Sequence, residues 1–181
     1  MTPEESWKIL ESADLLYDEV QVREAITRLG AEITAKLRDR YPLVLAVMGG
    51  SIFFAGNLLP LLHFPLEFDY VQASRYGKAT FGGKVVWKVE PGENVRGRNV
   101  LVLDDILDGG DTLAAICGRV RALGAAGVFS AVLTDKDIGR AKPAVPDFVG
   151  LKLPNRYVFG CGMDVSGAWR NLPAIYAVKE T

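Results

Sequence analysis

The sequence has few cysteines, a single histidine and no long apolar run. Its 181 residues include two cysteines, Cys117 and Cys161, and one histidine, His63. Two cysteines are too few for a disulfide framework, and His63 alone gives no basis for a metal cluster or for a Ser-His or Cys-His catalytic pair. We expect Cys117 to be a small core residue on an apolar helix face. A reducing cytoplasm is the simplest compartment for such a chain.

The chain also lacks a secretory signal, a membrane span and an excess of charge. The opening residues MTPEE are acidic, and no apolar run reaches the length of a transmembrane helix. The formal net charge of -1 at pH 7 gives no reason to expect a nucleic-acid groove. The Gly-Lys-Thr phosphate loop and the dinucleotide fingerprint are both missing. We therefore expect neither a membrane nor a nucleic acid as partner.

The order of patterns predicts an α/β protein with a doubly wound, mainly parallel sheet. A hydrophobic content of 49% over 181 residues is enough for one domain with a substantial core. Thr2 and Pro3 mark a helix start, and apolar residues from Val22 to Leu37 follow helical spacing. Strands alternate with helical patterns. We expect strands at 43–48, 66–72, 84–89, 99–103 and 128–133, and short ones at 157–161 and 175–178.

One segment, VLVLDDILDGGDTL at residues 100–113, joins a strand to a helix through an acidic turn. Consecutive apolar residues predict a strand buried on both faces, and helical spacing begins at Thr112. The turn therefore follows the carboxyl end of a strand, where open α/β sheets bind ligands, and the helix N-terminus favours an anion. Gly109 and Gly110 allow close backbone approach to a phosphate and a positive φ.

Four acids, Asp104, Asp105, Asp108 and Asp111, fall within eight positions of this segment. They repel one another unless a cation or a hydroxyl-rich ligand lies between them. Their carboxylates can accept hydrogen bonds from sugar hydroxyls, with Mg²⁺ balancing the charge. Two alternatives are helix capping and a receiver-domain acidic pocket, which leaves the glycine pair unexplained.

A second strand-turn-helix segment is VMGGSIFF at residues 47–54. A further segment, LPNRYVFGCGMD, occupies residues 153–164. The three segments, in this order and spacing, resemble the hypoxanthine-guanine phosphoribosyltransferases of the type I phosphoribosyltransferase family. Lys136 and the segment WRNLP at 169–173 also match, so the resemblance covers about residues 43–178. It implies one domain over 1–181, with a core at about 40–150 and a small hood from about 1–20 and 151–181.

The resemblance implies purine salvage in the cytoplasm. The reaction would be Mg²⁺-dependent transfer of the 5-phosphoribosyl group from phosphoribosyl pyrophosphate to hypoxanthine or guanine, giving IMP or GMP and pyrophosphate. A homodimer or homotetramer is expected. Two alternatives are a xanthine-preferring transferase and a regulatory relative that binds RNA or another protein, but the intact acids together with Lys136 and Tyr157 favour catalysis.

By resemblance, the acidic turn holds the phosphoribosyl group. Asp104 and Asp105 would engage the ribose hydroxyls directly or through Mg²⁺. Asp108 would lie near the purine N7 and exchange a proton there as the catalytic residue, helix capping being its structural alternative. The backbone of four consecutive residues would cradle the 5′-phosphate: Gly109, Gly110, Asp111 and Thr112. Gly109 replaces a frequent hydroxyl residue, which weakens that cradle slightly.

Pyrophosphate would be held by Gly49, Gly50 and Arg170. Many relatives have lysine where this chain has Gly49, so one charged contact is missing or supplied elsewhere. The loop often has a cis peptide in this family. A glycine pair in a strand-to-helix turn also occurs for structural reasons alone.

The purine would be held by Lys136, Tyr157, Val158 and Asp164. Tyr157 would stack on the base, Val158 would offer backbone hydrogen bonds, and Lys136 would donate to O6. Asp164 would help to hold a second Mg²⁺, so the metal ligands would be Asp104, Asp105 and Asp164. Because adenine presents a donor at position 6, Lys136 predicts a preference for 6-oxopurines.

Each of these residues has an ordinary structural interpretation as well. Tyr157 fits a core position, Lys136 fits a solvated surface charge, and Asp164 with Arg170 fits a surface ion pair. The segment at residues 73–83 is polar and rich in glycine, which predicts a lid containing Arg75 and Tyr76, or else a plain hairpin loop.

Overall fold

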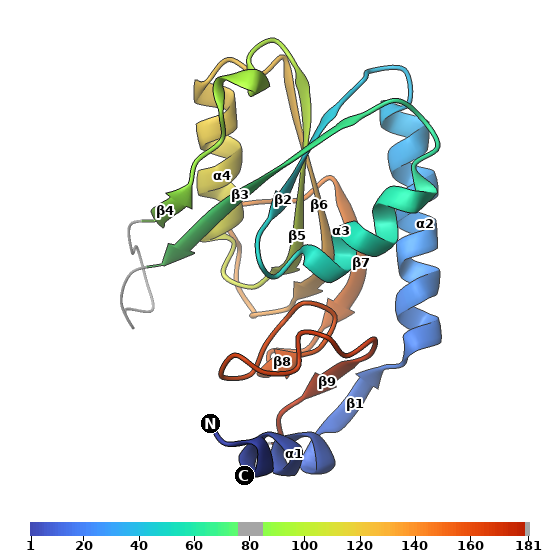
Figure 1. Cartoon of the computed structure of the whole chain (residues 1–181), viewed down its shortest axis with the longest axis vertical. Coiled ribbons are helices and arrows are strands. Elements are labelled where there is room, and N and C mark those ends of the chain that lie inside the picture. The colour runs from blue at the N-terminus through green and yellow to red at the C-terminus, as the bar shows by residue number, and fades with distance from the viewer. Residues whose placement is uncertain (76–84, 180–181) are drawn as a thin grey trace.

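The core of the protein is a six-stranded sheet with strand order β4-β3-β2-β5-β6-β7. The structure is a computed structural model that describes residues 1–75 and 85–179. Five strands run parallel, and β4 pairs antiparallel with β3 at one edge (Figure 1). The strands are β2 (Leu43–Val47), β3 (Glu67–Arg75), β4 (Val85–Val89), β5 (Asn99–Leu107), β6 (Gly127–Lys136) and β7 (Phe148–Leu153).

Helices cover both faces of this sheet, with α2 and α3 on one face and α4 on the other (Figure 1). In β5, Leu101 and Leu103 pack into the cluster with α2 and α3, whereas Val100 and Val102 pack into the cluster with α4. The predicted doubly wound, mainly parallel fold is therefore confirmed. The helices are α1 (Pro3–Ser12), α2 (Glu19–Leu37), α3 (Ile52–Leu58) and α4 (Asp111–Ala122), with 3-10 turns η1 (Leu59–Leu61) and η2 (Glu93–Val95).

The local signals for the first two helices are confirmed. Thr2 caps α1 through a capping box with Glu5, and Asp18 caps α2 in the same way with Gln21. The predicted apolar face of α2 is buried against the sheet: Val22, Ile26, Leu29, Ile33 and Leu37.

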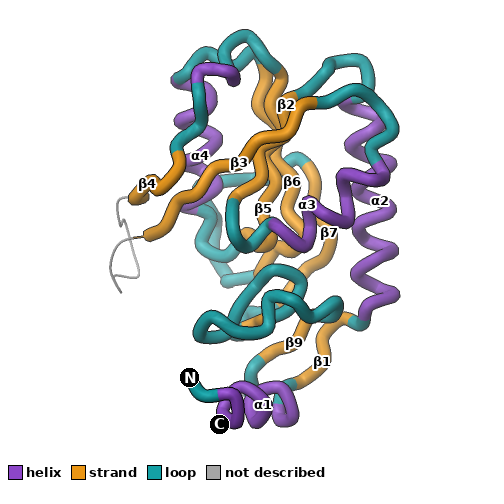
Figure 2. The backbone as a smooth tube through the Cα atoms, in the orientation of Figure 1, coloured by secondary structure: helices purple, strands orange, loops and turns teal. Residues whose placement is uncertain are grey.

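A second, three-stranded antiparallel sheet forms the predicted hood below the core (Figure 2). Its order is β1 (Asp14–Tyr17), β9 (Ile175–Ala177) and β8 (Val158–Phe159). The N-terminal and C-terminal parts of the chain are thereby joined. Helix α1 adds an edge-to-face contact between Trp7 and Trp169, with ring centroids 5.0 Å apart.

Two core strands are longer than the sequence pattern indicates. The pattern for β5 ends at residue 103, but the strand runs to Leu107, and β6 runs to Lys136 rather than 133. The two extensions pair with each other, since Ile106 lies opposite Thr134 and Leu107 opposite Asp135. Asp104 and Asp105 therefore belong to a strand, and the helix-capping interpretation is wrong for both.

Other boundaries also differ. The strand expected at 157–161 is limited to β8, because Gly160 and Cys161 have φ of +96° and +52° and leave the extended conformation. The sequence pattern does not indicate strands β1 and β7. Over residues 1–75 and 85–179, no helix combines the length and the apolar character that crossing a membrane requires.

Candidate active site

The site lies between the carboxyl ends of β2 and β5. The chain leaves β2 for its neighbour β3 on one side, whereas β5 is followed by β6 on the other side. At such a point the connections diverge and leave a crevice, which is where open α/β sheets bind ligands. The loop with Gly49 and Gly50 follows β2, and the turn with Gly109 and Gly110 follows β5.

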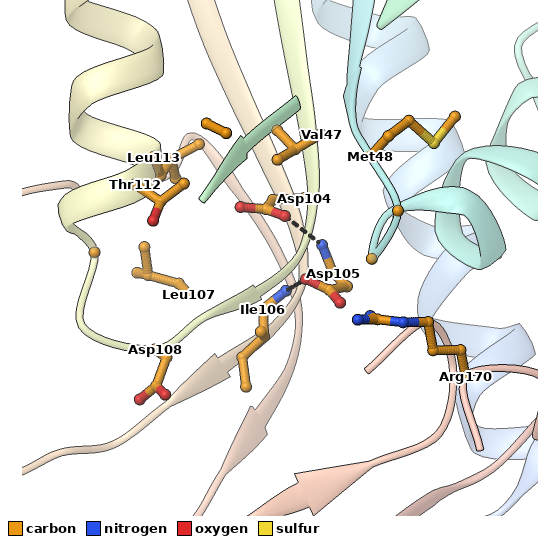
Figure 3. Close-up of a pocket in the computed structure, with 14 residues that line it drawn as sticks. Val47, Met48, Asp104, Asp105, Ile106, Leu107, Asp108, Thr112, Leu113 and Arg170 are labelled. Carbon is orange, nitrogen blue, oxygen red and sulfur yellow. Dashed lines mark hydrogen bonds between the residues drawn. The ribbon is translucent and has the colours of Figure 1, made fainter. Parts of the chain in front are cut away.

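A cavity of about 280 Å³ occupies this crevice (Figure 3). It brings together three predicted groups: the strand acids, the glycine loop and Arg170 from the C-terminal region. Its lining consists of Val47, Met48, Gly49, Gly50, Ala73, Asp104, Asp105, Ile106, Leu107, Asp108, Gly110, Thr112, Leu113 and Arg170. Gly109 and Asp111 belong to the same turn but not to this lining.

Asp104 and Asp105 are both buried in the cavity, each only 7% exposed. Asp104 Oδ1 accepts a hydrogen bond from the Asp105 backbone at 3.1 Å, and Asp105 Oδ1 accepts one from Ile106 at 2.8 Å (Figure 3). Burial, reinforced by the charge of Asp105, raises the pKa of Asp104 well above its usual value. Burial also raises the pKa of Asp105, against the lowering effects of hydrogen bonds and Arg170.

The glycine loop lies directly against these acids. A Cβ on Gly50 would come within 2.2 Å of Asp105 Oδ2, and one on Gly162 would come within 1.9 Å of the Gly50 carbonyl oxygen. Only glycine allows this stacking of three segments from distant parts of the chain. The peptide bond between Met48 and Gly49 is cis.

The turn after β5 presents the start of α4 to the cavity. Gly110 has φ of +89°, as its position in the turn was expected to require, and it has no side chain to cap the helix. The helix begins at Asp111, one residue before the predicted start. The backbone N–H groups of its first turn have no partner four residues back within the helix, and Thr112 adds a side chain to the lining. This arrangement suits an anion.

A second cavity of about 200 Å³ adjoins the first and shares Asp105, Ile106, Asp108 and Arg170 with it. It contains the predicted purine-site residues from β6, β8 and the loop after β8. The remaining lining residues are Lys136, Tyr157, Val158, Met163 and Asp164. The fold therefore places all four predicted purine-binding residues around one hollow.

In this second cavity a cation and an acid face each other. Lys136 Nζ lies 3.2 Å from Asp108 Oδ2, and the lysine side chain is only 10% exposed. A solvated surface role for Lys136 is therefore wrong. Tyr157 is 58% exposed, so it is not a core residue, and its ring is free to contact a ligand.

Asp164 and Arg170 form an ion pair at the rim shared by the two cavities. Arg170 Nη2 lies 2.5 Å from Asp164 Oδ1, and Arg170 also donates to the Gly162 carbonyl. Asp164 Oδ2 accepts from the Gly167 backbone at 2.7 Å. The guanidinium group points toward Asp105 in Figure 3, so Arg170 links the hood to the acidic strand.

The donor set suits a metal shared with a ligand better than one held by the protein alone. Among the side chains that the structure describes, no three acids, histidines or cysteines gather as a metal-binding group. Mg²⁺ keeps several waters and is typically held by one or two carboxylates together with substrate phosphates. The paired carboxylates of Asp104 and Asp105, buried beside an anion-binding turn, fit that description.

Several remaining predictions can be located. Arg75 is the last residue of β3, and Tyr76 lies outside the described residues, so the lid stays a prediction. Cys117 and Cys161 are free and buried, and burial raises the pKa of the two thiols to about 11 and about 12. His63 is exposed and lies away from both cavities, as expected.

Sequence patterns did not identify Ile106, Met163 or Lys142. Ile106 and Met163 line the second cavity, and their apolar side chains gave no signal beyond a core position. Lys142 lies in the loop between β6 and β7, which has no periodicity, yet its ammonium group bonds to the ends of two strands.

Known proteins resemble this chain in sequence and in fold. The family model for the phosphoribosyl transferase domain matches residues 12–166 of the sequence. A hypoxanthine-guanine-xanthine phosphoribosyltransferase of Tritrichomonas foetus is 35% identical over 168 residues, covering 92% of each chain. A hypoxanthine-guanine phosphoribosyltransferase of Bacillus subtilis (strain 168) is 33% identical over 166 residues, covering 91% of this chain and 92% of that protein.

The structural comparison agrees. The crystal structure of a hypoxanthine phosphoribosyltransferase from Staphylococcus aureus superposes with a TM-score of 0.88 and 26% identity, covering 95% of each chain. The fold is thus an α/β sheet with a crevice at the carboxyl ends of its parallel strands, and the family match makes the protein a transferase. The chain belongs to the phosphoribosyltransferase family, and the resemblance to its hypoxanthine-guanine members is confirmed.

Proposed function

We propose that the protein transfers the 5-phosphoribosyl group from phosphoribosyl pyrophosphate to hypoxanthine or guanine, giving IMP or GMP and pyrophosphate. The observation that carries this proposal is the pairing of Lys136 with Asp108 beside the acidic strand. A 6-oxopurine presents an acceptor at O6 next to N7, which carries a proton in one tautomer. A lysine donor beside a carboxylate acceptor matches that edge of the base.

The sugar side of the site supports the same reaction. The first turn of α4 and the backbone at Gly110 would hold the 5′-phosphate, because backbone N–H groups at a helix start and the helix dipole both favour an anion. Asp104 and Asp105 would hold the ribose hydroxyls. The backbone of Gly49 and Gly50 and the guanidinium group of Arg170 would hold pyrophosphate. These contacts fix the sugar between its leaving group and the base.

Displacement at C1′ places positive charge on the ribose ring, so neighbouring carboxylates stabilise the transition state. As the base reacts through N9, Asp108 would take the proton from N7, since its carboxylate lines the cavity where the purine binds. Lys136 would donate to O6, Val158 would bond through its backbone and Tyr157 would stack on the ring. Tyr157 is exposed enough to do so.

Asp104 and Asp105, with Asp164 for a second ion, would hold Mg²⁺. When bound, this cation balances the charge of pyrophosphate as it leaves. Asp164 already holds Arg170 and the Gly167 backbone, so its carboxylate is fixed in orientation before any ligand arrives.

We also propose a single domain over residues 1–181, a homodimer or homotetramer, and a cytoplasmic location. Phe68 and Tyr70 of β3 are large, apolar and substantially exposed, which favours a subunit interface on that side. Both cysteines are unpaired, as in a reducing compartment.

The test is a steady-state assay of the full chain with phosphoribosyl pyrophosphate, Mg²⁺ and each of hypoxanthine, guanine, xanthine and adenine. We expect turnover of hypoxanthine and guanine and little of adenine, because Lys136 would face a second donor. Turnover of xanthine well above the other bases would instead favour the xanthine-preferring alternative. Equal turnover of adenine and hypoxanthine would contradict the role of Lys136, and no turnover of any base would contradict the proposed reaction.

A further inference from the structure

Lys142 has a buried ammonium group outside the substrate contacts described above. Its side chain is only 10% exposed, although it lies in the loop between β6 and β7. The Nζ atom donates to the Leu107 carbonyl at 2.7 Å, to Asp135 Oδ1 at 2.6 Å and to the Lys136 carbonyl at 2.5 Å. An ammonium group has three donors, so these three bonds use its full capacity.

The three acceptors belong to the ends of two adjacent strands. Leu107 is the last residue of β5 and immediately precedes Asp108, whereas Lys136 is the last residue of β6. Leu107 also pairs with Asp135 in the sheet. The bonds from Lys142 therefore fix the two backbone positions from which Asp108 and Lys136 extend into the second cavity, where the purine is proposed to bind.

Asp135 strengthens this connection. Partial burial would raise its pKa, but hydrogen bonds and charges of Lys142 and Lys152 outweigh that effect and hold the pKa below its ordinary value. The carboxylate is therefore charged at neutral pH and holds the ammonium group of Lys142 in place. Bonds of this kind, with both partners charged, are the stronger ones in proteins.

We propose that Lys142 is a positioning residue for purine binding, which sets the distance between Lys136 and Asp108 by tying the end of β5 to the end of β6. This inference rests on the proposed function, because it concerns the same purine site. Lys142 itself touches no substrate in this scheme. Its effect passes through the backbone at Leu107 and Lys136.

The experiment compares Lys142→Met with Lys152→Met. Both substitutions remove an ammonium group from Asp135. However, the Lys152 side chain is 72% exposed, and it bonds to Asp135 Oδ2 rather than to the backbone carbonyls of Leu107 and Lys136. Methionine in place of Lys142 keeps the Cβ atom that lies against Gly110 in the turn after β5. The pair of variants therefore separates loss of charge near Asp135 from loss of the connection between the strands.

For Lys142→Met we expect kcat/KM for hypoxanthine to fall on the order of 10-fold, mainly through KM, with KM for phosphoribosyl pyrophosphate little changed. Lys152→Met should stay within about twofold of the wild type. Lys142→Arg restores a cation with several donors, and we expect it to recover most of the loss. Purine kinetics of Lys142→Met within about twofold of the wild type, or an equal loss in both methionine variants, would overturn the inference.

Crystal structures of the two variants give a readout independent of activity. We expect the contact of 3.2 Å between Lys136 and Asp108 to be lost in Lys142→Met and kept in Lys152→Met. A retained contact in Lys142→Met would refute the positioning role, whether or not the wild type is active. Inactivity of the wild type would refute only the proposed reaction. If Lys142→Met does not fold, Lys142→Gln, which keeps one amide donor, takes its place in both measurements.

Discussion

The two halves of the site balance their acids in different ways. On the purine side, Asp108 faces Lys136 and Asp164 faces Arg170, each across an ion pair. On the sugar side, Asp104 and Asp105 lie together in a buried strand, and among the described side chains neither forms an ion pair. Burial raises the pKa of both.

This difference separates what the chain supplies from what the ligand must bring. The purine side is charge-balanced within the protein, so its groups are arranged before a base binds. The sugar side has an excess of negative charge that becomes favourable only when a cation or hydroxyl groups arrive. Arg170 contacts both halves, since it lines both cavities.

The largest effect is expected on the sugar side. Replacing Asp104 and Asp105 together by asparagine keeps the shape of the strand but removes the charges that would stabilise the ribose ring. We expect kcat/KM for hypoxanthine to fall by about 100-fold or more. The measurement is steady-state kinetics at saturating Mg²⁺. Activity close to that of the wild type would mean that these acids do not serve the reaction.

A smaller effect is expected on the purine side. Lys136→Met leaves the purine O6 without its donor, and we expect a loss of about 10- to 100-fold in kcat/KM for hypoxanthine. Adenine never used that donor, so its low kcat/KM should change much less. The ratio of the two values measures discrimination, and an unaltered ratio would contradict the role of Lys136.

The residue that joins the two halves should give a smaller effect, confined to one ligand. Arg170→Ala removes the cation from pyrophosphate and from Asp164, and we expect the KM for pyrophosphate in the reverse reaction to rise about 10-fold. Arg170→Lys, which keeps the charge but not the planar fork, is the matched control and should lie between. Unchanged reverse kinetics would remove Arg170 from the pyrophosphate site.

The smallest effect concerns stability. Because the folded pKa of Asp104 is raised, protonation favours the native state, and this contribution is lost as pH rises from about the ordinary value of 3.8 through the folded pKa. Asparagine in place of Asp104 carries no charge at any pH, so Asp104→Asn does not lose this stability as pH rises. We expect the free energy of unfolding of the ligand-free variant to exceed that of the wild type by about 1 kcal/mol near neutral pH.

Urea denaturation of both proteins from acid to neutral pH measures this difference. The gap between variant and wild type should widen with rising pH and close below the ordinary aspartate pKa. A constant gap would show that Asp104 is not the titrating group, and it would weaken the contrast between the two halves.

The residues of the proposed sugar side follow a local sequence pattern, whereas those of the proposed purine side come together only in the fold. The acids, glycines and first turn of α4 follow one another within residues 104–112, so local patterns define them. Pairing of Lys136 with Asp108 depends on how far β5 and β6 extend together, and aspartates do not favour strands. The contact of Gly162 with Gly50 and the bonds of Lys142 arise only from tertiary packing, which no local pattern encodes.

The small sheet has a consequence for the order of assembly during translation. Its middle strand, β9, comes from residues 175–177, whereas every strand of the large sheet precedes residue 154. A nascent chain can therefore form the large sheet with its acidic strand before Arg170 and the strand that pairs with Val158 are made. The half proposed to select the base is finished last, so a prematurely released polypeptide would retain the acidic strand and the turn after it, without the segment proposed to recognise the purine.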